Sequence, residues 1–199
     1  MRWDRFFDDL EDQLASEWEA ERAALDTEAE RLRLSRVELR DRLTMLTSRE
    51  ATSDPPTFHL CDGTVIQAAA TAVGVDWAAL DPPGPGEMLV PLASIEGVGM
   101  PHADILRSAR PAPERSALAE RMTFGFVLRG LVRRRVGVAV QLRRGGSPLT
   151  GTIDRAGADH LDIALHDAGA PRRSGHVTAF RVIPFSAIAW VRLESPAVI

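Results

Sequence analysis

Arginine is the residue type in this sequence whose density points most directly to a chemistry. All 24 basic side chains are arginine, and nine of them lie between residues 129 and 173. A guanidinium carries five N–H donors in a planar fork that fits phosphate or carboxylate oxygens two at a time. Arg155 lies in this stretch. We predict that the other eight form an anion-binding surface: Arg129, Arg133, Arg134, Arg135, Arg143, Arg144, Arg172 and Arg173.

Charge is distributed unevenly along the chain, which leaves two kinds of anionic partner open. Residues 1–106 hold 21 acidic residues and 9 arginines, a net charge of −12, whereas residues 107–199 hold 7 acidic residues and 15 arginines, a net charge of +8. The basic half could neutralise the phosphates of RNA or another polyanion. It could instead pair with acidic protein surfaces, including the chain's own first half. RNA is preferred to duplex DNA because no groove-reading helix is evident.

Aromatic residues bear on the choice between these partners. Proteins that bind single-stranded nucleic acid usually combine aromatic rings with their cations so that bases can stack. The chain contains no Tyr. The phenylalanines of the basic half are interpreted as core residues, which counts against RNA without excluding it: Phe124, Phe126, Phe180 and Phe185.

Two further groups of residues could support metal or thiol chemistry. His160, Asp162 and His166 fall on one face of a strand, and imidazole and carboxylate ligands suit several divalent metals. The solvent face of an antiparallel strand is the preferred interpretation. Cys61, which follows His59 closely, is interpreted as a structural cysteine near a hairpin rather than an activated thiolate. We therefore predict a non-enzymatic protein with no catalytic residue, no metal and no cofactor.

The first quarter of the chain predicts a long helix. Residues 3–49 contain neither Pro nor Gly, and apolar residues recur there at steps of three and four, as on one face of an amphipathic helix. A break near Asp26 or Ser35 is expected over such a length. We predict that the apolar face binds a protein partner or a second copy of the chain through Trp3, Phe6, Phe7, Leu10, Leu14 and Trp18.

The remainder of the sequence contains an internal repeat. Three short motifs, at residues 60–63, 74–76 and 90–95, recur at 142–146, 157–159 and 183–188. Such self-similarity indicates duplication of one small unit. Alternating apolar residues and Gly or Pro turns predict five strands in each copy. Their expected ranges are 57–60, 65–73, 77–80, 88–90 and 95–98 in the first copy, and 136–142, 149–154, 160–165, 177–183 and 188–193 in the second.

These patterns predict an α+β protein in which an N-terminal amphipathic helical arm is followed by two small five-stranded antiparallel barrels, each preceded by a helix. We expect the two copies to be separately compact, although such small units are marginal alone. The expected regions are an acidic helical region (1–53), an acidic first barrel (54–100), a linker (101–113), and a helix with a basic second barrel (114–199).

A helix followed by five short strands, with Gly63 or Gly146 in the first hairpin and Gly-x-Asp before the third strand, resembles the Sm-like barrel. The likeness covers roughly residues 57–98 and 136–193. It implies RNA binding, since Sm-like proteins, including the Hfq-type chaperone, bind RNA as rings. Here the turn into the last strand carries Pro91 and Pro184, and proline weakens the strand edge through which ring neighbours pair. We therefore expect two barrels packed within one chain and no ring.

The opening Met1-Arg2-Trp3-Asp4 and Asp9-Leu10-Glu11 also resemble a group of actinobacterial proteins, from which no activity follows. No apolar run approaches the roughly 20 residues that a membrane helix needs. The amino terminus lacks the apolar stretch of a signal peptide. We expect a cytoplasmic protein that does not enter a membrane.

Overall fold

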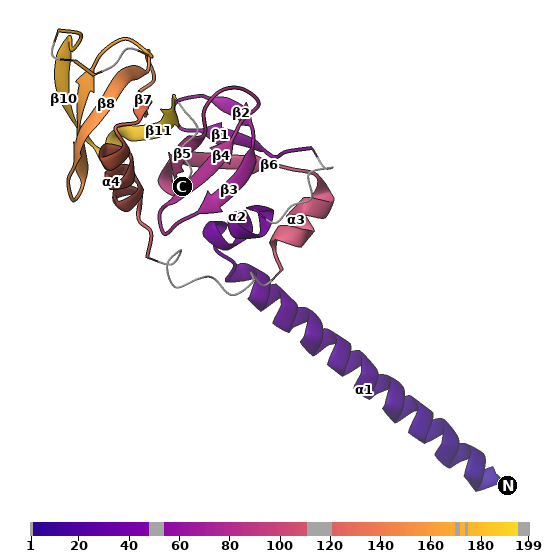
Figure 1. Cartoon of the computed structure of the whole chain (residues 1–199). Coiled ribbons are helices and arrows are strands. Elements are labelled where there is room, and N and C mark those ends of the chain that lie inside the picture. The colour runs from indigo at the N-terminus through magenta and orange to yellow at the C-terminus, as the bar shows by residue number, and fades with distance from the viewer. Residues whose placement is uncertain (1, 48–53, 111–120, 170–171, 174, 195–199) are drawn as a thin grey trace. The chain divides into compact units, whose positions relative to one another are not determined.

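The computed structural model describes residues 2–47, 54–110, 121–169, 172–173 and 175–194, and side chains from residue 13 onward. These residues form two units, 1–38 and 39–199. The structure confirms the α+β class, with an N-terminal helix and antiparallel sheets. Figure 1 shows the elements and their labels.

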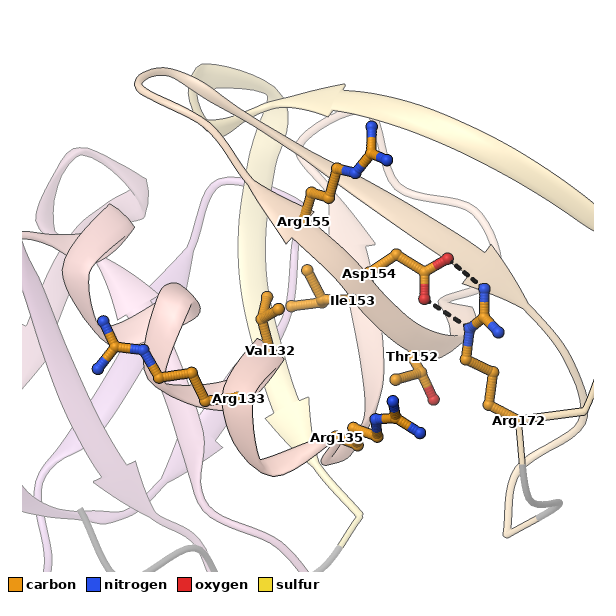
Figure 2. A pocket seen from close by; sticks show the side chains of 8 residues that line it. All are labelled: Val132, Arg133, Arg135, Thr152, Ile153, Asp154, Arg155 and Arg172. Atoms are coloured by element: carbon orange, nitrogen blue, oxygen red, sulfur yellow. Dashed lines mark hydrogen bonds and ion pairs between the residues drawn. The ribbon is translucent and has the colours of Figure 1, made fainter.

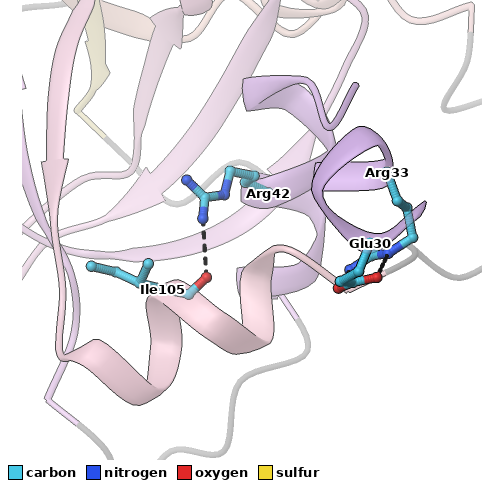
Figure 3. A network of polar contacts seen from close by, with 4 residues as sticks. All are labelled: Glu30, Arg33, Arg42 and Ile105. Carbon is cyan, nitrogen blue, oxygen red and sulfur yellow. Dashed lines mark hydrogen bonds and ion pairs between the residues drawn. The ribbon is translucent and has the colours of Figure 1, made fainter. Parts of the chain in front are cut away.

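The N-terminal unit is one helix, α1 (Arg2–Ser35). The predicted break near Ser35 is confirmed, because a new helix, α2 (Leu39–Thr47), begins in the second unit. Near the end of α1 the Arg33 guanidinium donates to both carboxylate oxygens of Glu30, at 2.7 and 2.6 Å (Figure 3). This hydrogen bonding holds the pKa of the Glu30 carboxyl below its ordinary value. Ion pairs of this spacing favour the helical conformation of an exposed segment.

The first copy of the repeat contains six strands where five were expected. The expected strand 65–73 is divided at buried Ala68 into two shorter strands that belong to different sheets. A short 3-10 turn, η1 (Leu92–Ser94), separates the last two strands. The strands are β1 (Thr57–Leu60), β2 (Val65–Gln67), β3 (Ala69–Val73), β4 (Trp77–Asp81), β5 (Met88–Pro91) and β6 (Ile95–Gly99).

The second copy has the five expected strands and the same turn before the last of them, η2 (Phe185–Ala187). In the described part of the chain between the copies there are two helices, α3 (His102–Ser108) and α4 (Phe124–Arg134). α3 forms inside the stretch interpreted as a linker, and Arg42 of α2 donates to the Ile105 carbonyl of α3 at 3.0 Å (Figure 3). The strands are β7 (Gly137–Leu142), β8 (Leu149–Ala156), β9 (His160–Leu165), β10 (Ala179–Pro184) and β11 (Ile188–Leu193).

Equivalent positions in the two copies form the same backbone hydrogen bonds. The amide of Gly74 donates to the carbonyl of Trp77 at 2.9 Å, as that of Gly157 does to His160 at 2.8 Å. Likewise the first amide of η1 donates to the carbonyl of Asp76, and the first amide of η2 to that of Asp159. The repeated motifs therefore encode repeated turns.

The strands pair into two sheets that do not respect the copy boundary. A three-stranded sheet has the order β2-β1-β6, and an eight-stranded sheet has the order β10-β9-β8-β7-β11-β5-β4-β3. The pairings of the described strands close no barrel within either copy. Instead, the larger sheet passes from one copy into the other where β11 lies between β7 and β5 (Figure 1).

The pairing of β11 with β7 and β5 forms the joint between the copies, and side chains on both faces of the sheet are buried there. One core cluster combines Trp77 and Leu89 of the first copy with Val138 and Ile163 of the second. The other includes Trp190 of β11 among residues of the first copy and α2. The indole Nε1 of Trp190 donates to Asp62 at 3.1 Å. The two copies thus share their cores.

Polar contacts from the turns support the same joint. Arg143 donates to the Ser94 hydroxyl at 3.0 Å, and that hydroxyl donates to the Ile188 carbonyl at 2.9 Å. β5 pairs with β11 through Met88 and Leu89, before Pro91 is reached. Proline at this edge was expected to weaken strand pairing, yet β11 pairs beside it, because Pro91 pairs with Trp77 of β4 and lies outside the residues that pair with β11.

Two glycines in the loop before β5 allow the joint to be tested. Both have positive φ, +135° at Gly84 and +89° at Gly86. A Cβ on Gly86 would lie 1.9 Å from the Leu193 carbonyl oxygen of β11, whereas one on Gly84 meets nothing within 4 Å. We expect Gly86→Ala to lower the free energy of unfolding by about 1 to 3 kcal/mol more than Gly84→Ala, measured by urea denaturation. Equal losses would contradict this placement of β11.

Candidate anion-binding site

Helix α4 is fixed at its N-terminus by two side chains that accept hydrogen bonds from its free amides. The Thr123 hydroxyl accepts from the Phe126 amide at 3.3 Å, and the Asp76 carboxylate of the first copy accepts from the Phe124 amide at 2.7 Å. Such caps contribute roughly 0.5 to 2 kcal/mol. The apolar face of α4 buries Leu128 and Leu131 in the core, so the position of its C-terminal end is well determined.

The C-terminal end of α4 places an arginine in an unusual backbone conformation. Arg135 has φ +52°, and it is the only non-glycine residue with positive φ in the described part of the chain. Its amide donates to the Val132 carbonyl at 3.1 Å, and the Val136 amide donates to the Leu131 carbonyl at 3.3 Å. This is the Schellman ending, in which glycine usually occupies the left-handed position. The arginine therefore carries a backbone cost of roughly 1 to 2 kcal/mol.

A bulge in β8 positions the next part of the site. The pairing with β9 shifts between Ile153 and Arg155, so that Asp154 is an extra residue in the strand. Bulges of this kind redirect side chains. Asp154 accepts two hydrogen bonds from the Arg172 guanidinium, both at 2.5 Å (Figure 2). These bonds raise the pKa of Arg172 above its ordinary value.

Together these elements line an open pocket of about 520 Å³. The C-terminal end of α4 forms one wall, the bulged part of β8 forms the floor, and Arg172 projects from the loop between β9 and β10 (Figure 2). Arg135 reaches toward Thr152, whereas the Arg133 head points away (Figure 2). The lining residues are Val132, Arg133, Arg135, Thr152, Ile153, Asp154, Arg155 and Arg172.

The charge of this pocket favours an anion. Four guanidinium groups and one carboxylate line it, which gives a net charge of +3. The negative end of the α4 dipole offsets only about half a charge. Within the described residues, the side chains of Arg133, Arg135 and Arg155 have no hydrogen bond or ion pair. Their donors are thus open to a ligand.

The structure brings together three of the eight predicted arginines, Arg133, Arg135 and Arg172. Arg129 instead donates to the Gly157 carbonyl at 3.2 Å, and Arg143 serves the joint between the copies. The other three, Arg134, Arg144 and Arg173, are exposed and do not line the pocket.

Three residues of the pocket were missed as site residues. Arg155 belonged to the counted arginine stretch but not to the predicted set, and its strand position alone did not favour it. Thr152 had no signal in the sequence. For Asp154 the one available signal was its place beside Arg155 in an expected strand, and its role depends on the β8 bulge.

The trio of His160, Asp162 and His166 does not form a common site. His166 is buried, and its ring nitrogens contact the Thr152 hydroxyl at 2.8 Å and the Asp167 carbonyl at 3.0 Å. Because a carbonyl only accepts, Nδ1 of His166 carries the proton in this arrangement. Across the described residues no cluster of His, Cys, Asp and Glu is suited to a metal ion.

His160 has a different role from His166. Its Nδ1 lies 2.8 Å from the Asp159 carboxylate, and this hydrogen bond holds the pKa of Asp159 below its ordinary value. The ring covers Gly157, where a Cβ would approach the His160 ring to 2.7 Å. His160 therefore supports the turn before β9.

The thiol candidate also lacks a site around it. Cys61 is half-buried beside the core that contains Trp190, whereas His59 is exposed.

A second, smaller pocket of about 240 Å³ is lined by β2, the proline-rich loop 82–85 and Arg192.

Two of the four phenylalanines interpreted as core are exposed, so that interpretation was wrong for them. Phe126 is 46% exposed and Phe180 is 68% exposed. Phe124 is buried, and its ring meets the half-buried Phe185 ring edge-on at 5.7 Å. The sequence pattern misled because Phe126 faces away from the buried side of α4 and Phe180 lies on an edge strand.

The predicted partner-binding face of α1 is described only in part. The side chains of Trp3, Phe6, Phe7 and Leu10 lie outside the described residues. Further along, α1 exposes a series of large apolar side chains, with exposed fractions between 49% and 68%: Leu14, Trp18, Leu25 and Leu32.

Comparison with known proteins returns no relative for this chain. No protein-family model matches it, and no match was found among curated proteins or solved structures. Among the described helices, none combines the length and apolar character needed to cross a membrane.

The conformation of Arg135 gives a test that separates stability from binding. Arg135→Gly removes the left-handed strain, so we expect the free energy of unfolding to rise by about 1 kcal/mol. The neighbouring Arg134→Gly changes a residue of the helix itself, and we expect a loss of about 1 kcal/mol. Thermal and urea denaturation of the full chain would measure both. A destabilised Arg135→Gly variant would mean that the side chain of Arg135 supports the fold.

Proposed function

We propose that this protein is a non-enzymatic binding protein whose basic second copy holds the phosphates of single-stranded RNA. The observation that carries the proposal is the pocket between α4 and β8, an open volume of about 520 Å³ lined by the Arg172–Asp154 pair and by Arg133, Arg135 and Arg155, whose side chains have no partner among the described residues. One guanidinium group can donate two parallel hydrogen bonds to two oxygens of the same phosphate. The strained backbone at Arg135 supports a ligand role, because strain is retained mainly where a side chain is needed.

Two further features support RNA among the possible polyanions. The pocket is lined by a helix end, a strand and a loop, which suits a flexible strand better than the major groove of a duplex. Phe126 offers an exposed ring in the same half of the chain, and exposed aromatic rings stack on bases.

The order of elements also supports the proposed likeness to Sm-like proteins. Each copy has a helix, α2 or α4, before its strands and a 3-10 turn before its last strand. We propose that each copy is an Sm-like unit whose barrel is opened by the pairing between copies. Under this proposal RNA binds the second copy on the side where α4 lies, and not at the pore of a ring.

The proposal predicts how affinity for RNA depends on salt. The full chain is titrated with labelled single-stranded RNA between about 50 and 200 mM salt. Contact with roughly three phosphates gives a logarithmic slope of about −2. We expect Arg155→Ala and Arg172→Ala each to weaken binding about tenfold or more, because a hydrogen bond to a charged group contributes roughly 1.5 to 3 kcal/mol. Arg144→Ala, outside the pocket, is the matched control and should change affinity less than the pocket variants.

Asp154 provides a test of opposite sign. Asp154→Asn removes the only carboxylate of the pocket and releases Arg172 from its ion pair. We expect tighter RNA binding, whereas Asp81→Asn, which makes the same charge change on an exposed residue of the first copy, should have a much smaller effect. Equal gains from the two variants would mean that net charge, and not the pocket, governs binding. Absence of binding at about 50 mM salt would refute the RNA proposal.

A protein-interaction adaptor is the second candidate function. The specific observation behind it is the exposed apolar series on α1, from Leu14 to Leu32. An adaptor would bind its partner through this helix and would use the arginines against acidic protein surfaces. A Trp18→Glu and Leu25→Glu double variant tests it. Under the adaptor function this variant loses the proteins that the full chain retains from a cell extract, and under the RNA function it keeps its RNA affinity.

A further inference from the structure

Equivalent strands of the two copies have very different surroundings. β5 and β10 are equivalent because each ends at the proline that precedes η1 or η2. β5 lies between β4 and β11, whereas β10 pairs only with β9 among the described strands (Figure 1). Leu89 of β5 is fully buried, while its counterpart in β10, Val182, is 69% exposed. One copy thus has a covered edge, and the other has an open and apolar one.

The strand that could cover this edge also has an equivalent in the chain. β6 and β11 each follow the 3-10 turn, so Ile95 corresponds to Ile188 and Val98 to Val191. β11 pairs with two neighbours, β7 and β5, whereas β6 pairs with β1 alone among the described strands. The two strands with an open edge, β10 and β6, are therefore the counterparts of β5 and β11, which pair with each other within the chain. Open edges of this kind invite strand addition.

We propose that β10 of one chain pairs with β6 of a second copy, in the antiparallel register that β11 adopts on β5. Within the chain Val191 lies opposite Leu89, and Arg192 lies opposite Met88. Transferred to the equivalent residues, this register places Val182 of one chain opposite Val98 of the other. It also places Arg181 opposite Gly99. The proposal does not depend on RNA binding.

Charge complementarity favours this occupant. β10 exposes Arg181 and β6 exposes Glu96, which lie on opposite faces in this register, so the complementarity is that of the two copies as a whole. Residues 54–106, which contain β6, carry seven acidic residues and no arginine, while the second copy is basic. A head-to-tail contact brings unlike surfaces together, whereas pairing of β10 with another β10 would oppose like charges. The contact is heterologous, so each chain keeps one open edge of each kind for a further chain.

Cysteine cross-linking of the full chain tests the register. In a Cys61→Ser background, one variant carries Val182→Cys and another carries Val98→Cys. Directly opposed residues of antiparallel strands have Cβ atoms about 4.5 to 5.5 Å apart, so a disulfide can form. We expect a dimer after oxidation of the mixture and little from either variant alone. Val65→Cys mixed with Val98→Cys is the matched control, because Val65 is 60% exposed on β2, another edge strand.

The outcomes separate the alternatives. Dimer from Val182→Cys alone would show edge-to-edge pairing of like strands and would overturn the proposal. The absence of any selective cross-link would do the same. Sedimentation velocity provides a second measurement, in which Val182→Lys should abolish concentration-dependent association without lowering the melting temperature, since Val182 is exposed. Association that persists in Val182→Lys but is lost in Leu25→Glu would assign self-association to α1 and refute the strand contact.

Discussion

The double pairing of β11 is the interaction on which the rest of the second unit depends. A strand at the end of the second copy completes the sheet of the first, and its side chains enter both cores. Full burial of an aliphatic side chain such as Val191 or Leu89 contributes roughly 1.5 to 3 kcal/mol. Loss of this strand would expose β5 and remove one of the donors to the Asp62 carboxylate, which also accepts from Thr64. The two copies of the repeat therefore depend on each other for a complete sheet and core, and a linker alone does not describe how they are connected.

The arginine pocket follows from that joint. Asp76 of the first copy accepts from the first amide of α4, and the buried face of α4 then determines where its last turn ends. Two local irregularities complete the site: the left-handed Arg135 and the bulge at Asp154. The left-handed backbone of Arg135 carries a cost that glycine at this position would avoid, whereas bulges also occur in other strand pairs of the sheets. The strands and loops of the first copy, residues 54–106, contain no arginine, so β8 and the loop that carries Arg172 have no equally basic counterpart there.

Most strands could be predicted from the sequence, because alternation such as that of residues 136–142 reports a half-buried strand directly. The division of the strand at Ala68 could not be predicted, since this alanine-rich stretch contains no Gly or Pro that would interrupt a strand. The division arises because β2 and β3 belong to different sheets. The pairing of β11 with β5 was equally hidden, because it joins residues far apart in sequence. Phe180 is exposed because β10 is an edge strand among the described residues, and local sequence does not encode a strand's place in the sheet. The set of arginines that lie close together could not be predicted either, because it depends on where α4 ends and on the bulge in β8.

The separation of β5 from β11 along the chain has a consequence for synthesis. Leu89 and its partner Val191 are 102 residues apart, and a ribosome adds roughly 5 to 20 residues per second. The apolar edge of the nascent first copy therefore waits about 5 to 20 seconds for the strand that covers it. Until β11 has been made, β5 has only β4 as a neighbour and the cores of the first copy lack Trp190 and Val191.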